Sequence, residues 1–421
     1  MTDAVDRIVI VGGGLAGAKA AEALRGRGFT GALILVADEP HLPYERPPLS
    51  KTYLAGSTRF EDAVVHPQAW YADNDVDLRL GTHAASIDPA AHVVTLADGA
   101  TLGYDKLLLA TGSTPRHLTV PGADATGVLH LRRREDADAI RATFGTGHRL
   151  VIIGAGWIGL EVAAAARQAG AEVTVIEMAA LPLVSVLGDE IAQVFADLHR
   201  ANGVDLRLGA KLEEITIVGD RATGVWLGDG STVPAVGVVV GVGVTPNTEL
   251  AATAGLAIDN GVLVDASLRT SDADIYAVGD IANHDHPVLG RRVRVEHWAT
   301  ALNQPATAAA AMLGATGAAA VYDELPYFFS DQYDLGMEYI GYAPPGSYTR
   351  VVVRGSLEQR EFVAFWLDDR SRVMASMNVN VWDVVDVVKP LIRAGKPVDP
   401  DRLADGSTPL EDVVAQALGG S

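Results

Sequence analysis

The feature that most constrains this chain is the glycine-rich stretch Ile8–Gly17. A continuous apolar run breaks at Gly12, glycine recurs at Gly14 and Gly17, and the apolar residues from Leu15 to Leu24 take a helical spacing. This pattern predicts a buried strand, a tight turn and the start of a helix. The unpaired N–H groups and the dipole of such a helix N-terminus favour a bound phosphate.

Each glycine of this stretch has its own expected task. Gly12 makes the turn, Gly14 allows backbone to approach a pyrophosphate, and Gly17 allows the helix to pack closely on the strand. A second apolar run, Ala32–Ala37, is followed by Asp38. It lies about 20 residues beyond the last glycine, where a carboxylate that binds the adenosine ribose is expected. The stretch therefore predicts a dinucleotide site.

The same pattern occurs a second time in the chain. The run Leu150–Gly159 repeats the turn, with glycines at Gly154, Gly156 and Gly159, and the apolar strand that follows ends at Glu177. Later landmarks recur in the same order, pairing Asp98 with Asp229, Gly112 with Gly243 and Pro115 with Pro246. The chain is thus predicted to contain two dinucleotide-binding domains.

The two sites are expected to hold different ligands. A carboxylate at Glu177 accepts hydrogen bonds from ribose hydroxyls and repels a 2′-phosphate, and residues 178–184 contain no Arg to hold that phosphate. NADH is therefore favoured over NADPH at the second site. The first site is interpreted as a flavin site, because a flavin accepts a hydride from NADH and releases electrons singly or in pairs.

Composition excludes several other classes of protein. The chain has 421 residues, 48% of them hydrophobic, and no cysteine. Its length predicts two or three domains, and the lack of cysteine excludes disulfide exchange, thiolate catalysis and Cys-ligated metal centres. A dispersed net charge of −20 disfavours nucleic-acid binding. No long apolar run and no signal segment are found, so we expect a cytoplasmic chain without a membrane span or a metal site.

The rest of the chain carries a few further signals. Pro47–Pro48 predict a stiff extended segment ahead of Lys51, and the short strand before Gly279–Asp280 places an acid at a strand's carboxyl end. Residues Trp298–Leu313 are Ala-rich and helical, with Pro305 as a kink or a late start. Strand-like runs and one helix follow, at Met337–Tyr342, Thr349–Val353, Glu361–Leu367, Val373–Met377 and Val381–Arg393. They predict a separate C-terminal α+β domain.

Seven segments together have the pattern of a known family: Gly12–Gly17, Arg46–Lys51, Ala110–Gly112, Gly154–Glu161, Gly243–Asn247, Tyr276–Asp280 and Ser330–Tyr333. In them the chain resembles, over essentially its whole length, the NADH-dependent, FAD-containing reductases of oxygenase ferredoxins. The resemblance implies an α/β fold with two Rossmann-like FAD/NAD(P)-binding domains of the glutathione-reductase type plus a C-terminal α+β domain. It implies an FAD-binding domain at 1–115 and 247–322, an NADH-binding domain at 116–246, and the C-terminal domain at 323–421.

The resemblance also implies which residues bind the cofactors. Those expected at FAD are Gly12, Gly14, Ala16, Gly17, Asp38, Arg46, Lys51, Ala84, Ala110, Thr111, Gly112, Arg132, Gly279, Asp280 and Trp298. Those expected at NADH are Gly154, Gly156, Ile158, Gly159, Glu177 and Gly243. The N-terminus of a helix at Trp298 would favour the negative charge that develops on the flavin.

Lys51 and Glu161 are the residues that the resemblance places at the chemistry. In the family the matching lysine and glutamate come from different domains and meet beside the flavin and the nicotinamide. The ammonium would stabilise transferred negative charge, and the glutamate would orient it. The alternatives are a solvated surface lysine and an acid that merely favours the first turn of a helix.

The acceptor side is less constrained by the residues. Tyr327, Phe328 and Phe329 suit either a docking surface or core packing. Basic residues at Arg291, Arg292, Arg294, Lys389, Arg393 and Lys396 form either a positive face for an acidic ferredoxin or scattered surface charge. The basic residues that relatives carry after the Trp298 position are replaced here by Pro305 and alanines. His297 suits a proton relay and Trp382 a contact with the flavin, but both are interpreted as structural, Trp382 as a core aromatic at a helix start.

The function expected is that of an NADH:ferredoxin oxidoreductase serving a cytochrome P450 or a ring-hydroxylating oxygenase. Its expected partner is an acidic two-iron, two-sulfur or similar ferredoxin, with the chain a monomer or a homodimer. Rival acceptors are rubredoxin, a quinone, and oxygen as in oxidases that resemble apoptosis-inducing factor. An alternative of another class is an NADH-sensing flavoprotein switch in which turnover is incidental.

Overall fold

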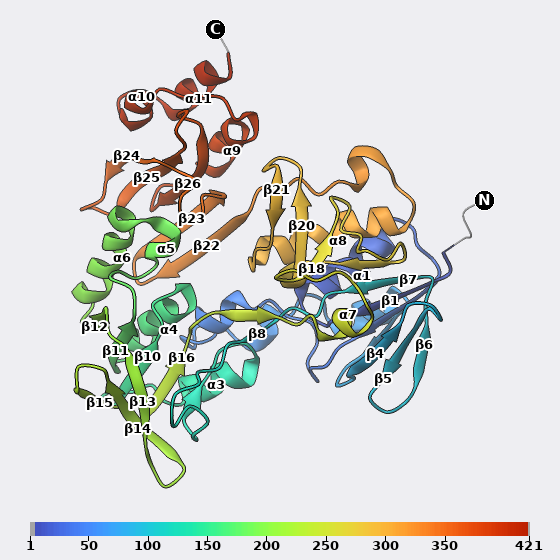
Figure 1. The fold of residues 1–421 in the computed structure, drawn as a ribbon, viewed down its shortest axis with the longest axis horizontal. Coiled ribbons are helices and arrows are strands. Elements are labelled where there is room, and N and C mark those ends of the chain that lie inside the picture. Colours follow the sequence, from blue (N-terminus) through green and yellow to red (C-terminus); the bar gives the residue numbers. More distant parts are fainter. Residues whose placement is uncertain (1–4, 420–421) are drawn as a thin grey trace. The chain divides into compact units, whose positions relative to one another are not determined.

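The computed structural model describes residues 5–419, which form two compact units (Figure 1). The first unit comprises residues 1–45, 60–114 and 245–326, and the second comprises 46–59, 115–244 and 327–421. Two of the passages between the units fall within short strands, β8 (Ser113–Pro115) and β17 (Val244–Pro246).

A five-stranded parallel sheet forms the centre of the first unit. Its strands, in spatial order, are β19 (Ile275–Ala277), β7 (Lys106–Leu109), β1 (Arg7–Val11), β2 (Ala32–Val36) and β3 (Val76–Arg79). Strand β1 is buried from Ile8 onward and β7 from Leu107 onward, as the continuous apolar runs predict for strands that are covered on both faces. Because all five strands are parallel, their carboxyl ends share one edge of the sheet.

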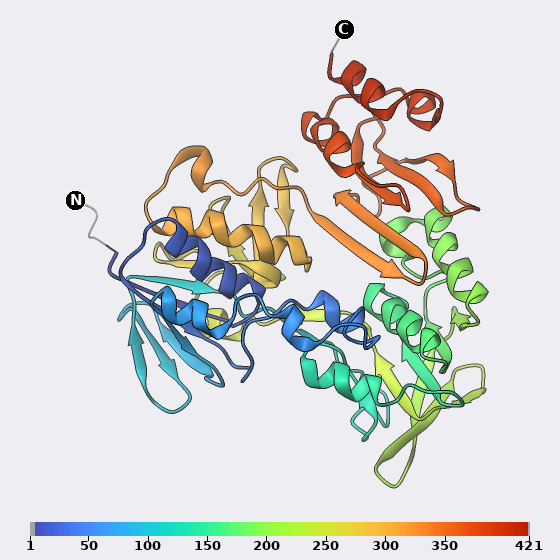
Figure 2. The same ribbon diagram turned by 180° about the vertical axis from the view of Figure 1, so that it is seen from behind.

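Two helices pack against each other in this unit, α1 (Leu15–Gly26) and α8 (Trp298–Met312), and Figure 2 shows them side by side. The other elements are α2 (Gln68–Asp73), α7 (Glu249–Thr253), η2 (Phe60–Ala63), η3 (Gly279–Ile281), η4 (Gly317–Ala320), the sheet of β4 (Ala84–Asp88), β5 (Val93–Leu96) and β6 (Thr101–Gly103), and the sheet of β18 (Val262–Val264), β20 (Ala282–His286) and β21 (Arg291–Val293).

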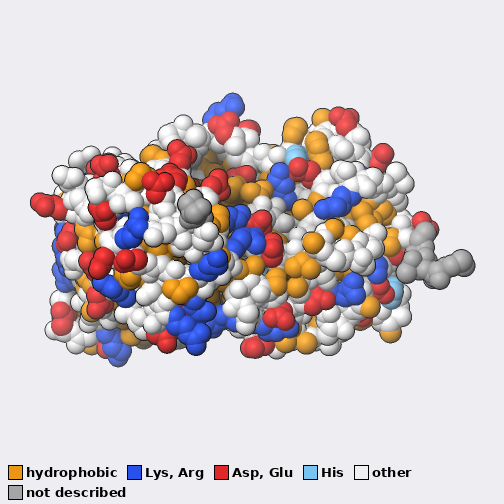
Figure 3. All heavy atoms as spheres, turned by 90° about the horizontal axis from the view of Figure 1, so that it is seen from above, with side chains coloured by type: hydrophobic (Ala, Val, Ile, Leu, Met, Phe, Trp, Pro, Cys, Tyr) orange, Lys and Arg blue, Asp and Glu red, His pale blue; other side chains and the backbone are white. Residues whose placement is uncertain are grey.

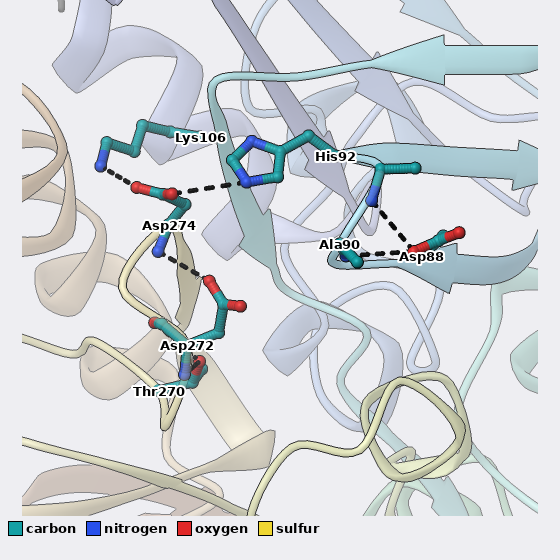
Figure 4. A network of polar contacts seen from close by, with 8 residues as sticks. Asp88, Ala90, His92, Lys106, Thr270, Asp272 and Asp274 are labelled. Carbon is teal, nitrogen blue, oxygen red and sulfur yellow. Dashed lines mark hydrogen bonds and ion pairs between the residues drawn. The ribbon is translucent and has the colours of Figure 1, made fainter.

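A polar network supports the opposite, amino-terminal edge of the first sheet (Figure 4). Lys106, the first residue of β7, binds the Asp274 carboxylate, which also lies 3.5 Å from the His92 Nε2 atom. The Asp274 N–H in turn donates to Asp272 at 2.8 Å. The network therefore joins the loop before β19 to β7 and to the β4–β5 hairpin.

The second unit repeats the parallel sheet. Its order is β12 (Asp205–Leu208), β11 (Glu172–Glu177), β10 (Arg149–Ile153), β16 (Gly237–Val240) and β9 (Val128–Leu129). The accompanying elements are η1 (Pro47–Ser50), α3 (Arg134–Arg141), α4 (Trp157–Gln168), α5 (Val184–Leu187), α6 (Asp189–Ala201) and the sheet of β13 (Leu212–Val218), β14 (Arg221–Leu227) and β15 (Thr232–Pro234). The internal duplication predicted from the sequence is thus visible in the sheets.

The C-terminal part of this unit is an antiparallel sheet with helices at its end (Figure 1). The strand order is β22 (Tyr327–Gln332), β23 (Leu335–Gly341), β26 (Val373–Val379), β25 (Glu361–Leu367) and β24 (Arg350–Ser356). The helices are α9 (Val385–Ala394), α10 (Pro400–Ala404) and α11 (Leu410–Leu418). The predicted α+β character of this region is confirmed, and β22 is an additional strand that the sequence analysis did not assign.

One local prediction about proline is wrong, and of the two alternatives given for another, a kink or a late start at Pro305, the late start is wrong. Pro47 and Pro48 open the 3₁₀ helix η1 instead of an extended segment, since proline suits the first helical positions, where its missing N–H costs nothing. Helix α8 begins at Trp298 and continues through Pro305, so Pro305 does not mark a late start. The helix lacks the hydrogen bond that an N–H at this position would have donated to the Ala301 carbonyl.

Candidate dinucleotide sites and a buried ion pair

The first glycine-rich turn lies between β1 and α1. A Cβ atom on Gly12 would lie 2.1 Å from the Ala110 carbonyl oxygen, and one on Gly17 would lie 2.0 Å from the Gly12 carbonyl oxygen. Gly12 also has a φ of +125°, which L side chains rarely adopt. At Gly14, by contrast, a Cβ would meet no described atom within 4 Å outside the neighbouring residues. Two glycines thus close the turn, and the third leaves its backbone open.

This open position fits a pyrophosphate. Gly14 is the N-cap of α1, and within the described residues no side chain caps it. The N–H groups of the first turn therefore remain available to an anion, which the helix dipole also favours.

The other predicted residues of the first unit gather at the same sheet edge. Asp38 follows β2, and its Oδ1 lies 3.2 Å from His83 Nδ1. Ala84, the next residue after His83, is buried at the start of β4. Asp38 and Ala84 are therefore close to each other in this unit.

Gly279 and Asp280 follow β19, two strands from β1. A Cβ on Gly279 would lie 3.5 Å from the Ala16 Cβ, so η3 lies against the start of α1. The Gly279 N–H donates to the Gln304 side chain of α8 at 2.8 Å, whereas Gln304 Nε2 has no partner among the described residues. Trp298 begins α8. Predicted residues from α1, η3 and α8 thus converge.

The strand end after β7 is fixed by Asn247. The Thr111 hydroxyl donates to the Asn247 carbonyl at 2.7 Å, and the Asn247 side-chain amide donates back to the Thr111 carbonyl at 2.8 Å. The Asn247 N–H bonds the Gly112 carbonyl at 2.9 Å. The carbonyl oxygen of Ala110, just before Thr111, is the atom that lies too close to Gly12 for a Cβ atom there.

The second glycine-rich turn, between β10 and α4, has the same construction. A Cβ on Gly154 would lie 2.5 Å from the Gly241 carbonyl oxygen, and one on Gly159 would lie 2.2 Å from the Gly154 carbonyl oxygen. At Gly156, which caps α4, the nearest described atom outside the neighbouring residues lies at 4.0 Å. The same division of tasks among three glycines therefore occurs in both units, and both turns fit an adenine dinucleotide.

Glu177 ends β11 beside the second turn. Its two carboxylate oxygens accept from the Ala155 and Ala179 N–H groups, both at 2.8 Å, and this fixes the carboxylate where ribose hydroxyls are expected. Two exposed apolar side chains belong to this part of the unit: Ile158, at the start of α4, is 42% exposed, and Met178, next to Glu177, is 74% exposed. Gly243 has a φ of +101°, and its carbonyl accepts from the Arg116 N–H at 3.0 Å.

Lys51 and Glu161 form an ion pair inside the second unit. Lys51 Nζ lies 2.7 Å from Glu161 Oε1, and the side chains are only 12% and 4% exposed. The interpretation of Lys51 as a solvated surface residue is therefore wrong, and Glu161 is more than an acid favoured by a helix dipole. Lys51 Nζ also lies 5.3 Å from the centre of the Phe329 ring, within range of a cation–π contact.

Two hydroxyl groups complete the surroundings of Glu161. Ser50 Oγ donates to Glu161 Oε2 at 2.5 Å, and Ser330 Oγ donates to Oε1 at 2.7 Å. Both oxygens of the Glu161 carboxylate therefore have a hydroxyl donor, and this fixes its orientation. Arg46 and Arg132 lie near each other in the same unit, with an Arg46 Nη1 hydrogen bond to the Arg132 carbonyl.

Several residues of this region were missed by sequence reasoning. Gln304 and Met178 carried no recognised signal, because isolated polar or apolar residues acquire a role only from their three-dimensional neighbours. Ser50 lies in the Arg46–Lys51 segment of the family resemblance, but no role was assigned to it. Ser330 and Gln332 lie in the Ser330–Tyr333 segment that carried the family resemblance, so a signal for them was present but unassigned.

Burial and packing describe three further side chains that the sequence analysis singled out. Trp382 is 57% exposed and precedes α9, so its interpretation as a core aromatic is wrong. Burial lowers the pKa of His297 to about 4, which keeps this side chain neutral at physiological pH. Phe328 stacks on Tyr339, with ring centroids 5.0 Å apart, and contacts Trp157 edge-on, so it packs within the second unit.

The basic residues considered above for the docking of a ferredoxin differ in their contacts, and at least two of them bind groups of this chain. Arg294 binds Glu296 at 2.5 Å and the Asp280 carbonyl at 3.1 Å, and Lys396 Nζ binds the Leu418 carbonyl at 2.7 Å. The face drawn in Figure 3 mixes acidic, basic and apolar side chains. Among residues 5–419, no helix has the length and apolar character that crossing a membrane requires.

Comparisons with known proteins agree with this geometry. Residues 6–305 match the family model described as pyridine nucleotide-disulphide oxidoreductase, and residues 327–414 match the reductase C-terminal model. The chain is 42% identical over 409 residues to the ferredoxin reductase subunit of a 5,5′-dehydrodivanillate O-demethylase from Sphingobium sp. (strain NBRC 103272 / SYK-6), covering 97% of this chain and 98% of that protein.

Two further similarities lie in the same group. The ferredoxin–NAD(+) reductase component of an anthranilate 1,2-dioxygenase system from Burkholderia cepacia is 43% identical over 407 residues, covering 96% of this chain and 98% of that protein. A crystal structure of a covalent putidaredoxin reductase–putidaredoxin complex matches with a TM-score of 0.94 and 39% identity, covering 99% of this chain and 100% of that one. The predicted α/β fold is confirmed, and the chain belongs to the pyridine nucleotide-disulphide oxidoreductase family, within its group of ferredoxin reductases with a reductase C-terminal domain.

Proposed function

We propose that this chain is an NADH-dependent, FAD-containing reductase that passes electrons to an iron–sulfur ferredoxin of a cytochrome P450 or ring-hydroxylating oxygenase system. The observation that carries the proposal is the pair of glycine-rich turns of identical construction, one in each unit. The second of them ends beside a fixed carboxylate at Glu177. The family membership and the names of the relatives support the same activity.

The two cofactors supply the redox chemistry, since bound FAD accepts an electron pair from NADH and releases electrons singly. The task of the chain is to hold them. At FAD we assign the predicted set Gly12, Gly14, Ala16, Gly17, Asp38, Arg46, Lys51, Ala84, Ala110, Thr111, Gly112, Arg132, Gly279, Asp280 and Trp298. At NADH we assign Gly154, Gly156, Ile158, Gly159, Glu177 and Gly243, and we add Met178, whose exposed side chain adjoins Glu177.

Lys51 and Glu161 are the proposed catalytic pair. The Glu161 carboxylate holds the Lys51 ammonium at 2.7 Å, and two serine hydroxyls donate to this carboxylate and fix its orientation. A fixed cation stabilises negative charge without reorganisation at the moment of transfer, and it acts most strongly where water is excluded. This role accounts for a lysine at a position where its side chain is only 12% exposed.

We propose a division of the chain into three domains. Residues 1–115 and 247–322 are proposed to bind FAD, 116–246 to bind NADH, and 323–421 to form the C-terminal domain, which contains the reductase C-terminal match. The segment 46–59, which carries Lys51, is compact with the second unit.

The proposed partner is an acidic ferredoxin, with the chain a monomer or a homodimer in the cytoplasm. A crystal structure of a relative is described as a complex of a reductase with its putidaredoxin. Exposed Arg291 and Arg292 on β21, and basic residues Lys389 and Arg393 on α9, are the candidate contacts with such a partner.

The test is a pair of anaerobic stopped-flow experiments on the purified flavoprotein. The flavin absorbance is expected to bleach rapidly with NADH and slowly with NADPH, and to recover rapidly only when oxidised ferredoxin is added. Lys51→Met should slow the bleaching at least tenfold, while Arg350→Met, at an exposed position of the edge strand β24, should leave it unchanged.

Other outcomes identify the rival functions. Fast recovery with rubredoxin, a quinone or oxygen, and not with any ferredoxin, would assign another acceptor. Slow bleaching with a long-lived charge-transfer band would favour the sensing switch. A preparation that cannot be reconstituted with FAD would refute the proposal as a whole.

A further inference from the structure

A chain of buried hydrogen bonds leads away from the ion pair. Ser330 Oγ, which donates to Glu161, accepts from Gln332 Nε2 at 3.1 Å. Gln332 Oε1 in turn lies 2.8 Å from His199 Nε2. Ser330, Gln332 and His199 are each exposed by no more than 1%, so water does not compete for these contacts. The elements that carry these residues, β22 and α6, belong to the same unit as α4 and are labelled in Figure 1.

The chemistry of the groups fixes the direction of every hydrogen bond. Glu161 only accepts, so the Ser330 hydroxyl donates to it, and the lone pairs of that hydroxyl accept from the Gln332 amide nitrogen. The Gln332 carbonyl oxygen then requires a donor, which must be the Nε2–H of His199. His199 therefore carries its proton on Nε2 when neutral.

Two observations keep His199 in that state. Burial lowers its pKa to about 4, against a smaller opposite effect of the Gln332 hydrogen bond, so the ring is neutral at physiological pH. The Tyr333 hydroxyl lies 3.4 Å from Nδ1, the ring nitrogen left as the acceptor, and the Tyr333 ring contacts the His199 ring edge-on at 5.3 Å. No described acid lies among the direct hydrogen-bond partners of this histidine.

The backbone is strained at Tyr333, which contacts His199 at the far end of this series of hydrogen bonds. Tyr333 has a φ of +57°, in the left-handed region that costs a bulky residue about 1–2 kcal/mol. Such strain persists only where surrounding contacts over-determine the conformation. Here it places the Tyr333 side chain against His199.

We propose that Ser330, Gln332 and His199 are positioning residues for the reductase reaction. His199 donates to Gln332, Gln332 donates to Ser330, and Ser330 donates to Glu161, and this relay of hydrogen bonds holds the Glu161 carboxylate oriented toward Lys51. The effect of the relay on the reaction rests on the proposed function, whereas the hydrogen bonds themselves do not. Asp331, beside Ser330, is the other acid whose charge interacts with Lys51 and Glu161; burial raises its pKa, and Lys51 opposes that shift.

The first experiment compares three variants of the FAD-loaded protein in anaerobic stopped flow. Ser330→Ala removes one donor to Glu161, and the limiting rate of flavin reduction should fall about tenfold while the Kd for NADH stays within twofold. Ser330→Thr keeps the hydroxyl and should recover most of the rate. Ser376→Ala is the matched control, because Ser376 is equally buried in the same sheet and its Oγ has no partner among residues 5–419.

The second experiment measures which nitrogen of His199 carries the proton, because the direction of the relay depends on it. In protein labelled with ¹⁵N-histidine, the signal lost in His199→Gln identifies His199, which should show a proton on Nε2 and no titration between pH 5 and 8. A ring that titrates near pH 6.5, or that carries its proton on Nδ1, would overturn the proposal, as would equal rates for Ser330→Ala and Ser376→Ala. If NADH does not reduce the flavin of the wild-type protein, the proposed function is refuted. The histidine signals still show whether the hydrogen bonds of the relay have the proposed direction.

Discussion

Replacing Gly156 and Gly159 by alanine should separate cofactor binding from stability within one turn. At Gly156 the backbone has φ −78° and ψ 179°, which alanine adopts freely, and a new methyl meets no described atom closer than 4.0 Å outside its neighbours. Gly156→Ala should therefore change the free energy of unfolding by less than about 1 kcal/mol. The methyl instead occupies the space through which a pyrophosphate approaches the backbone.

The two variants should give opposite results. The Kd for NADH should rise at least tenfold in Gly156→Ala, which corresponds to about 1.4 kcal/mol of binding free energy. In Gly159→Ala the methyl would lie 2.2 Å from the Gly154 carbonyl oxygen, far inside van der Waals contact. Relief requires α4 to move from β10, so the loss of stability should reach about 3 kcal/mol, the upper range for overpacking.

Both quantities can be measured on the same samples. Urea unfolding followed by tryptophan fluorescence gives the stability, and anaerobic titration of the flavin absorbance gives the affinity for NADH. The equivalent change at Gly14, where no described non-neighbouring atom lies within 4 Å, should weaken FAD retention and leave NADH affinity intact. Unchanged NADH affinity in Gly156→Ala, or a fully stable Gly159→Ala, would refute the division of tasks among the glycines.

Three further changes test other parts of the structure. Glu177→Gln removes the charge that repels a 2′-phosphate, so the ratio of NADPH to NADH affinity should rise about tenfold in parallel titrations, and an unchanged ratio would exclude this role. Burial lowers the pKa of His199 to about 4 and that of His284 to about 3, below the unfolded value of about 6.5, so the unfolded state binds more protons and stability falls as the pH drops from 6.5 toward 4. Urea midpoints should show this fall, and His284→Phe should reduce its slope by up to about 1.4 kcal/mol per pH unit; an identical slope would contradict the burial of a neutral ring. Asp274→Asn breaks the network of Figure 4 at the sheet edge opposite the first glycine-rich turn, so it should lower the melting temperature by a few degrees and leave flavin reduction unchanged, whereas a slower reduction would show that this network reaches the site.

The local motifs could be predicted because their chemistry is contained in adjacent residues. A glycine at position 12 or 154 is required by a backbone conformation, and the strand, turn and helix around it have distinct apolar periods. The acid at the end of the next strand follows at a fixed separation. Because these signals occur twice in the same order, the residues alone predict two dinucleotide sites.

The failures share one physical cause. Pro47–Pro48 and Pro305 were interpreted from local backbone preference, which does not distinguish an extended proline from one at a helix start, nor exclude proline inside a packed helix. Trp382 was interpreted from its apolar character alone, although its exposure depends on what covers it. In each case the deciding contacts come from elsewhere in the chain.

The amino-acid sequence alone predicts two dinucleotide sites, a preference for NADH at the second of them, and a reaction without thiols. The burial of Lys51 against Glu161 is visible only in the folded chain, as are the serine hydroxyls that bind Glu161 and the hydrogen bonds that continue from Ser330 to Gln332 and His199. These side chains come from segments up to 282 positions apart, between 50 and 332. The physical reason is that periodicity and turn geometry act over a few residues, whereas the orientation of a buried charge depends on every donor that folding brings to it.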